Sequence, residues 1–256
     1  MKKFHGSKLI AWILGASLLG ASLSTIAADA GSGDANEWKF GAEAYLWLPW
    51  IDVETQGGTS VEISLDDILT NLDMLFMGAV SARKGKWTLV TDVIYFDIES
   101  NENEPLPLLL TLDDVNLEAA IVTLQVRYNI SETDKYRIDL LAGARYLWLE
   151  AELQVKTRPP LPPGSSKASD SGSVWDGIVG VTGQMDLSDK WYLSGYADIG
   201  TGESDYTWQA SASAGYRFKR VHAMVGYRHL DYKLDSSAAF ADLSVTGPYV
   251  GVKFRF

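Results

Sequence analysis

The sequence predicts an all-β fold: a transmembrane, antiparallel, up-and-down β-barrel of ten strands, with eight or twelve strands as alternatives. Three features predict this fold. Apolar residues recur at every second position over long segments. The connections between these segments alternate between short and long. The tryptophans lie near the ends of the segments.

The first 30 residues have the organisation of a cleaved secretory signal peptide. Three lysines, Lys2, Lys3 and Lys8, precede an uncharged and mostly apolar run over residues 9–23. Small residues follow, and we expect cleavage between residues 27 and 30, which leaves residues 31–256 as a single barrel domain. A retained membrane anchor is the alternative, although the run is shorter than the ~20 residues of a spanning helix.

Ten segments show the period of two that is typical of strands. In residues 206–219, for example, Trp208, Ala210 and Ala212 share one face, and Gln209 and Ser211 lie on the other. The ten segments cover residues 38–50, 72–84, 87–100, 114–130, 136–155, 174–187, 190–201, 205–219, 221–235 and 242–256. Most are longer than the ~5–6 residues of an ordinary strand and reach the ~9–11 residues that a membrane-spanning strand needs.

The connections predict which end of the barrel faces which compartment. Short links lie at residues 85–86, 131–135, 188–189 and 220, and long links lie at residues 51–71, 101–113 and 156–173. Outer-membrane barrels have short turns in the periplasm and longer loops outside the cell. An even number of strands therefore places both termini in the periplasm.

The tryptophans of the mature chain form two groups. Trp38, Trp87 and Trp191 begin strands at the short-turn end, whereas Trp47, Trp50, Trp148, Trp175 and Trp208 lie near the loop end. Aromatic girdles at the two membrane interfaces account for this distribution. A soluble β-barrel or sandwich is the alternative, but it would bury its tryptophans in mid-strand.

The last strand ends on an aromatic residue without a polar tail. Val250, Val252, Phe254 and Phe256 share its lipid face. Pairing of this strand with the first closes the barrel, so that no strand edge remains in lipid.

Several stretches resemble a known family. They are LDMLFMGAVSARKGKWTLVTDVIYFDI (72–98), GYRF (215–218), GYRHLDY (226–232) and the final GPYVGVKFRF. Together they resemble proteobacterial outer-membrane β-barrel proteins, in particular small porin-like barrels of the OmpA/OmpW type. The resemblance covers the whole mature chain. It implies the outer membrane of a Gram-negative bacterium, lipid and lipopolysaccharide as surroundings, and recognition of Val250, Val252, Phe254 and Phe256 by the barrel-assembly machinery. It implies no particular activity.

Along each strand, every second residue faces outward (the outer phase) and the residues between them face inward (the inward phase). The inward phase places charged residues in the lumen. The acidic residues are Glu43, Asp92, Asp139, Asp176 and Asp198, and the basic residues are Arg127, Arg145, Arg217, Arg228, Lys253 and Arg255. Two interpretations stay open. In one, the charges are opposed across the constriction of a polar channel. In the other, they form an ion-pair network that fills a narrow interior, as in barrels of about eight strands.

Three further motifs stand out in the sequence. Ser64 and Asp67 form a capping-box-like pair that predicts a short helix near residues 65–71 in the first loop, either as a lumen plug or packed on the rim. His229 and Asp231 would supply part of a hydrolase site, but no serine nucleophile follows from their spacing. The proline-rich segment 158–163 predicts a stiff, exposed loop.

Composition restricts the function further. Without the signal peptide's three lysines, 19 basic residues remain against 33 acidic ones, a net charge of −14, which argues against nucleic-acid binding. The chain has no cysteine and few histidines, so no metal or other cofactor is expected. The favoured function is a closed or narrow-lumen outer-membrane barrel with a structural or surface-interaction role, and no enzymatic activity. A porin-like channel for small solutes is the alternative, and an outer-membrane hydrolase is least favoured.

Overall fold

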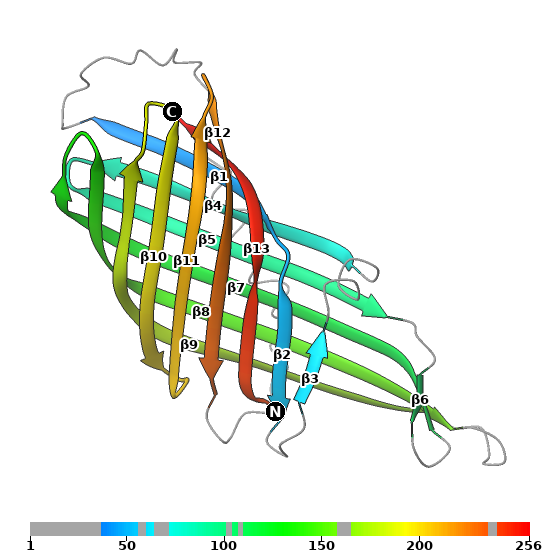
Figure 1. Ribbon diagram of the computed structural model, residues 1–256. Coiled ribbons are helices and arrows are strands. Elements are labelled where there is room, and N and C mark those ends of the chain that lie inside the picture. Colours follow the sequence, from blue (N-terminus) through cyan, green and yellow to red (C-terminus); the bar gives the residue numbers. More distant parts are fainter. Residues whose placement is uncertain are drawn as a thin grey trace. The chain divides into compact units, whose positions relative to one another are not determined.

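The computed structural model describes residues 37–55, 60–63, 72–100, 104–106, 110–157, 165–234 and 240–256. These residues form a closed antiparallel barrel of ten strands (Figure 1), as the sequence predicts. The wall strands are β1 (Trp38–Trp47), β4 (Leu72–Lys84), β5 (Trp87–Ser100), β7 (Leu110–Glu132), β8 (Tyr136–Thr157), β9 (Ser165–Asp186), β10 (Trp191–Gly202), β11 (Tyr206–Arg217), β12 (Val221–Lys233) and β13 (Phe240–Arg255). Three short strands accompany them: β2 (Trp50–Thr55), β3 (Ser60–Ile63) and β6 (Glu104–Leu106).

The first strand closes the barrel by pairing on both of its edges. Trp38 to Ala44 of β1 pair with Lys84 to Gly78 of β4, and Gly41 to Trp47 pair with Arg255 to Tyr249 of β13. The backbone donors and acceptors of both chain-terminal strands are therefore used in the ladder, which is the condition for a barrel in an apolar medium.

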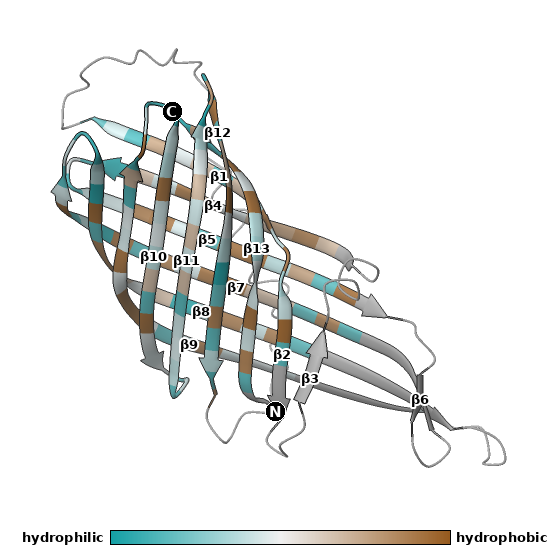
Figure 2. Cartoon of the chain, in the orientation of Figure 1, coloured by the Kyte–Doolittle hydropathy of each residue, from teal (hydrophilic) through white to brown (hydrophobic). Residues whose placement is uncertain are grey.

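Alternation along the strands separates an inner from an outer face. On β10, Tyr192 and Asp198 point inward and are buried, whereas Ile199 on the outer phase is 60% exposed. Val250, Val252 and Phe254 likewise lie on the outer phase of β13 and are exposed. Figure 2 shows polar and apolar residues alternating along the wall strands. A large apolar surface thus covers the outside of the barrel.

The prediction of a continuous first strand over residues 38–50 was wrong in detail. The strand breaks at Leu48-Pro49, because proline has no N–H to donate to a ladder. The amide of Leu48 donates to the carbonyl of Pro248 (2.9 Å), and the chain continues as β2, which pairs with β13 and forms a hairpin with β3. Segment 51–71, predicted as a loop, therefore begins with a hairpin.

The long links at 101–113 and 156–173 are also shorter than predicted. The strands β7, β8 and β9 contain 23, 22 and 22 residues, and β6 pairs with the start of β7. Residues 165–175 of β9 lie beyond the last β9–β10 pair, Asp176↔Gly202. At 3.3 Å per residue this extension measures roughly 35 Å.

Some predicted features fall outside the described residues. These are the signal peptide, the helix near residues 65–71 and the proline-rich segment 158–163. In the part of the chain that is described, no helix is long and apolar enough to cross a membrane.

Candidate functional site: the barrel interior

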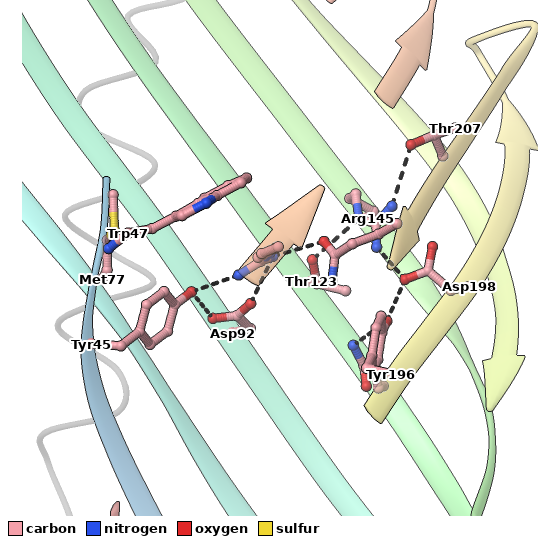
Figure 3. A network of polar contacts seen from close by, with 12 residues as sticks. Tyr45, Trp47, Met77, Asp92, Thr123, Arg145, Tyr196, Asp198 and Thr207 are labelled. Carbon is pink, nitrogen blue, oxygen red and sulfur yellow. Dashed lines mark hydrogen bonds and ion pairs between the residues drawn. The ribbon is translucent and has the colours of Figure 1, made fainter. Parts of the chain in front are cut away.

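Arg145 is the centre of one polar cluster inside the barrel (Figure 3). It points inward from β8 and is fully buried. Its Nη2 forms an ion pair with Asp198 of β10, its Nη1 donates to Thr207 (3.3 Å), and its Nε donates to Thr123 (3.4 Å). The hydroxyl of Tyr196 donates to the same Asp198 carboxylate. Four neighbouring side chains thus fix a buried charge in one orientation.

Arg228 of β12 is the centre of a second cluster. Its Nη2 donates to Asp92 (3.2 Å) and to Gln209 (2.7 Å), and its Nη1 donates to the Tyr45 hydroxyl (3.0 Å), which itself donates to Asp92 (2.6 Å). Asp92 lies on β5, and the strands β13, β1 and β4 separate β5 from β12 in the wall. This ion pair therefore reaches across the lumen.

Arg127 is held by neutral groups on the turn side of these clusters. Its Nε donates to Gln125 (3.0 Å), and its guanidinium carbon lies 5.8 Å from the centre of the Tyr196 ring. Gln125 in turn donates to the Tyr196 hydroxyl (2.9 Å). Since Tyr196 also contacts Asp198, Arg127 is linked to the Arg145 cluster.

The end of the barrel near the short turns carries further ion pairs, and three of them involve residues predicted to face the lumen. They are Lys253–Glu43 (3.3 Å), Arg217–Asp186 (2.5 Å) and Arg137–Asp139 (2.7 Å). Arg255 lies on the same inward phase of β13 as Lys253. The residues predicted to share the lumen thus occupy two levels: a buried polar layer and a wetter ring at the turn end.

Asp176 has a different role from the other inward acids. It pairs in the β8–β9 ladder with Arg145 and is 1% exposed. Its Oδ1 accepts a hydrogen bond from the backbone amide of Ser204 (3.0 Å). The carboxylate therefore holds the β10–β11 connection against β9.

The loop-side half of the interior is apolar, a feature that the sequence interpretation missed. Its buried members are Trp47, Ile51, Met77, Ile94, Ile98, Ile121, Leu147, Leu230, Tyr232, Leu243 and Val245. The indole Nε1 of Trp47 donates to the Gly247 carbonyl (3.1 Å) inside the barrel. Trp47 is thus a core residue, and its assignment to an interfacial girdle was wrong.

The neutral polar residues of the clusters were also missed. Tyr45, Thr123, Gln125, Tyr196, Thr207 and Gln209 all lie on the inward phase. The alternation of inward and outward residues is the signal that identifies them, because they share the inward positions with the charged residues. For the apolar half, the signal was that both faces of a strand become apolar, as over residues 93–96.

The histidine motif does not join the interior. His229 lies on the outer phase of β12, where its Nδ1 is 2.5 Å from the Thr246 hydroxyl. The centre of its ring lies 4.4 Å from that of Trp208, with the two rings tilted by 41°. Among the residues that the structure describes, no group of three potential metal ligands occurs.

Comparison with known proteins finds similar structures only. No family model and no curated protein matches the chain. The translocator domain of the autotransporter NalP from Neisseria meningitidis is 16% identical, with a TM-score of 0.46 and 98% of each chain covered. Ail of Yersinia pestis is 10% identical (TM-score 0.35; 86% of this chain and 99% of Ail), and the neisserial surface protein NspA is 12% identical (TM-score 0.33; 86% and 97%). Similarity at this level carries no argument about function.

Proposed function

We propose that the protein is an integral outer-membrane β-barrel with a closed interior and a structural or surface-interaction role. The outer face supports a membrane location. Large apolar side chains are exposed around the wall, among them Val80, Leu89, Leu124, Leu140, Val179, Ile199 and Val225. Exposed aromatic residues accompany them near the short turns, namely Trp38, Trp87, Tyr128, Tyr136, Trp191 and Phe218. Exposure of such a large apolar surface to water is unfavourable, whereas contact with lipid acyl chains is favourable.

The observation that carries the closed interior is the burial of its charges. Arg145, Asp198 and Arg228 are 0%, 6% and 7% exposed, and each is part of an ion pair. A water-filled channel would leave such groups hydrated. Buried charges persist only when they are paired and hydrogen-bonded, as these are. The apolar cluster adds a second closed layer towards the loops.

The extended strands support a role outside the membrane. The strands β7, β8 and β9 are about ten residues longer than β10, β11 and β12. We propose that this extension is the surface-interaction element. Both termini are then periplasmic, lipopolysaccharide surrounds the loop end, and the barrel-assembly machinery reads the last strand. No catalytic activity is proposed.

Two measurements on refolded protein test the closed interior. In planar lipid bilayers we expect small or rare conductance steps. Large, steady steps would favour the porin-like channel instead.

Cysteine labelling gives an independent test, because the chain has no native cysteine. Thr207 faces the lumen and is 0% exposed, whereas Asp205 is exposed at the adjacent turn. Thr207→Cys should resist a water-soluble thiol reagent until the barrel is unfolded, and Asp205→Cys should react in the folded state. Equal labelling rates in the folded state would mean that water fills the lumen.

A further inference from the structure

The outer face of the barrel contains an apolar groove near the short-turn end. It is a shallow, open hollow of about 540 Å³, lined by residues of β8, β9 and β10. Arg137, Gln184 and Ser194 of the inward phase border it, and the other lining residues lie on the outward phase. These residues are Tyr136, Ile138, Gly183, Met185, Leu193 and Gly195. The exposed lining surface is almost wholly apolar, and Tyr136, Met185 and Leu193 are exposed on the outer face, so the groove opens outward.

Two glycines make the groove. Gly183 and Gly195 are direct partners in the β9–β10 ladder, and both lie on the outer phase. A Cβ at Gly183 would come no closer than 3.5 Å to another atom, and one at Gly195 no closer than 3.9 Å. A Cβ at either position would therefore make only ordinary van der Waals contacts, and the two glycines leave the wall without side chains beside Tyr136, Met185 and Leu193.

Two turns of the same design stand at the ends of these strands. The sequences are Thr133-Asp134-Lys135-Tyr136 before β8 and Ser188-Asp189-Lys190-Trp191 before β10. In the first turn, the Thr133 hydroxyl accepts hydrogen bonds from the backbone amides of Lys135 and Tyr136 (both 3.2 Å). In the second, the Ser188 hydroxyl accepts those of Lys190 (3.3 Å) and Trp191 (3.1 Å). Both turns therefore present an acid, a lysine and an aromatic residue in the same order.

The two turns are adjacent and exposed. The carbonyl of Lys135 accepts the amide of Asp186 at the end of β9 (2.7 Å), immediately before the second turn. Asp134, Lys135, Asp189 and Lys190 are all exposed, and the described part of the chain shows no ion pair for any of them. The ammonium of Lys190 lies 6.0 Å from the centre of the Tyr216 ring.

We propose that this face is a binding site for one phospholipid whose headgroup carries both a phosphate and a primary amine. An acyl chain lies in the groove over Gly183 and Gly195. Lys135 and Lys190 bind the phosphate, and Asp134 and Asp189 accept hydrogen bonds from the ammonium. Glu132 is paired with Arg83 and Arg137, which leaves one acid and one lysine on each turn without a described ion pair. This balance matches a zwitterionic headgroup better than an anionic one. The inference rests on the proposed membrane location.

Native mass spectrometry of the refolded full-length protein in detergent tests the site. The probes are phosphatidylethanolamine, phosphatidylglycerol and phosphatidylcholine with identical acyl chains. We expect one phosphatidylethanolamine to be retained at a concentration about tenfold lower than either of the other two. Phosphatidylcholine is the stringent comparison, because its quaternary amine has no N–H. Equal retention of the three lipids, or preferred retention of phosphatidylglycerol, would overturn the proposal.

Variants separate the groove from the headgroup contacts. Gly195→Leu fills the groove and should lower retention of phosphatidylethanolamine about tenfold; Gly183→Leu is the second variant should the first fail to fold. Gly177→Leu is the matched control, because Gly177 is also an outward glycine of β9 with open space for a Cβ but lies outside the groove. If Gly177→Leu loses as much lipid as Gly195→Leu, the groove is not the site.

The headgroup variant replaces the four turn residues by Asp134→Asn, Lys135→Gln, Asp189→Asn and Lys190→Gln. It should reduce the preference for phosphatidylethanolamine to the level of phosphatidylcholine, and unchanged preference would refute the assignment of these turns. Lys86→Gln with Lys219→Gln, at two other turns, is the control. Insertion into vesicles is measured separately on each protein. Failure of the wild type to insert contradicts the membrane proposal, whereas normal insertion without selective retention contradicts only the lipid site.

Discussion

Arg145 carries a full charge at a position that water does not reach. Removing such a charge from water costs several kcal/mol, and only good geometry offsets that cost. Asp198, Thr123 and Thr207 supply this geometry from three different strands. The residue therefore specifies how β7, β8, β10 and β11 fit together more than it adds to stability.

Removing one member of the Arg145–Asp198 pair should destabilise the barrel more than removing both. Arg145→Met leaves the Asp198 carboxylate buried without its cation and should destabilise the refolded barrel by about 3–5 kcal/mol. Arg145→Met combined with Asp198→Leu removes both charges and should recover most of that loss. Urea unfolding in vesicles measures both variants. Equal losses for the single and the double variant would mean that Asp198 is not a buried, uncompensated charge.

At the scale of the strand, the alternation of inward and outward positions decides whether a side chain lies in the barrel interior or on its outer surface. Ala212 and Ser213 are neighbours on β11, yet Ala212 is exposed on the outer face, whereas Ser213 is 7% exposed and its hydroxyl lies 2.6 Å from that of Ser194. The inward position is therefore packed rather than open. Substitutions at inward positions should therefore change the packing of a filled interior, as they do in the core of a soluble protein.

A charge on the outer face tests that assignment. Ala212→Arg should cost about 2–4 kcal/mol if the site lies near the bilayer midplane, because the guanidinium meets lipid. The same residue type at the exposed turn, Lys219→Arg, should leave the free energy of unfolding nearly unchanged. Refolding titrations in vesicles measure both. A cost near zero for Ala212→Arg would contradict the inside–outside assignment of β11.

At the scale of the whole molecule, closure depends on the two terminal strands meeting. Seven residue pairs join β1 to β13, from Gly41↔Arg255 to Trp47↔Tyr249. The exposed apolar face of β13 carries Val250, Val252 and Phe254, and Phe256 completes the pattern. The last strand therefore has two tasks, closing the ladder and presenting the proposed assembly signal.

Deleting Phe256 separates these two tasks. The residue follows the end of β13 and forms none of the β1–β13 pairs, so its loss removes at most about 1.5–3 kcal/mol of apolar burial. We expect outer-membrane insertion in cells to fall by much more than the stability of protein refolded in detergent. Fractionation of cells and detergent unfolding measure the two quantities. Normal insertion of the deletion variant would contradict the role in assembly.

The sequence by itself predicted ten strands, the alternation of inward and outward residues along them, and the grouping of the short turns at one end of the barrel. These are local properties, because a period of two follows from the geometry of an extended chain. Only the tertiary structure decided which inward residues meet. Arg228 and Asp92 are 136 residues apart in the chain, and their contact across the lumen depends on the stagger of all ten strands. The length of β7, β8 and β9 is decided in the same way, by the partners that each segment finds. The break at Pro49 and the apolar run at residues 93–96 are local features of the sequence, but only the structure shows where the chain continues and what the apolar residues contact.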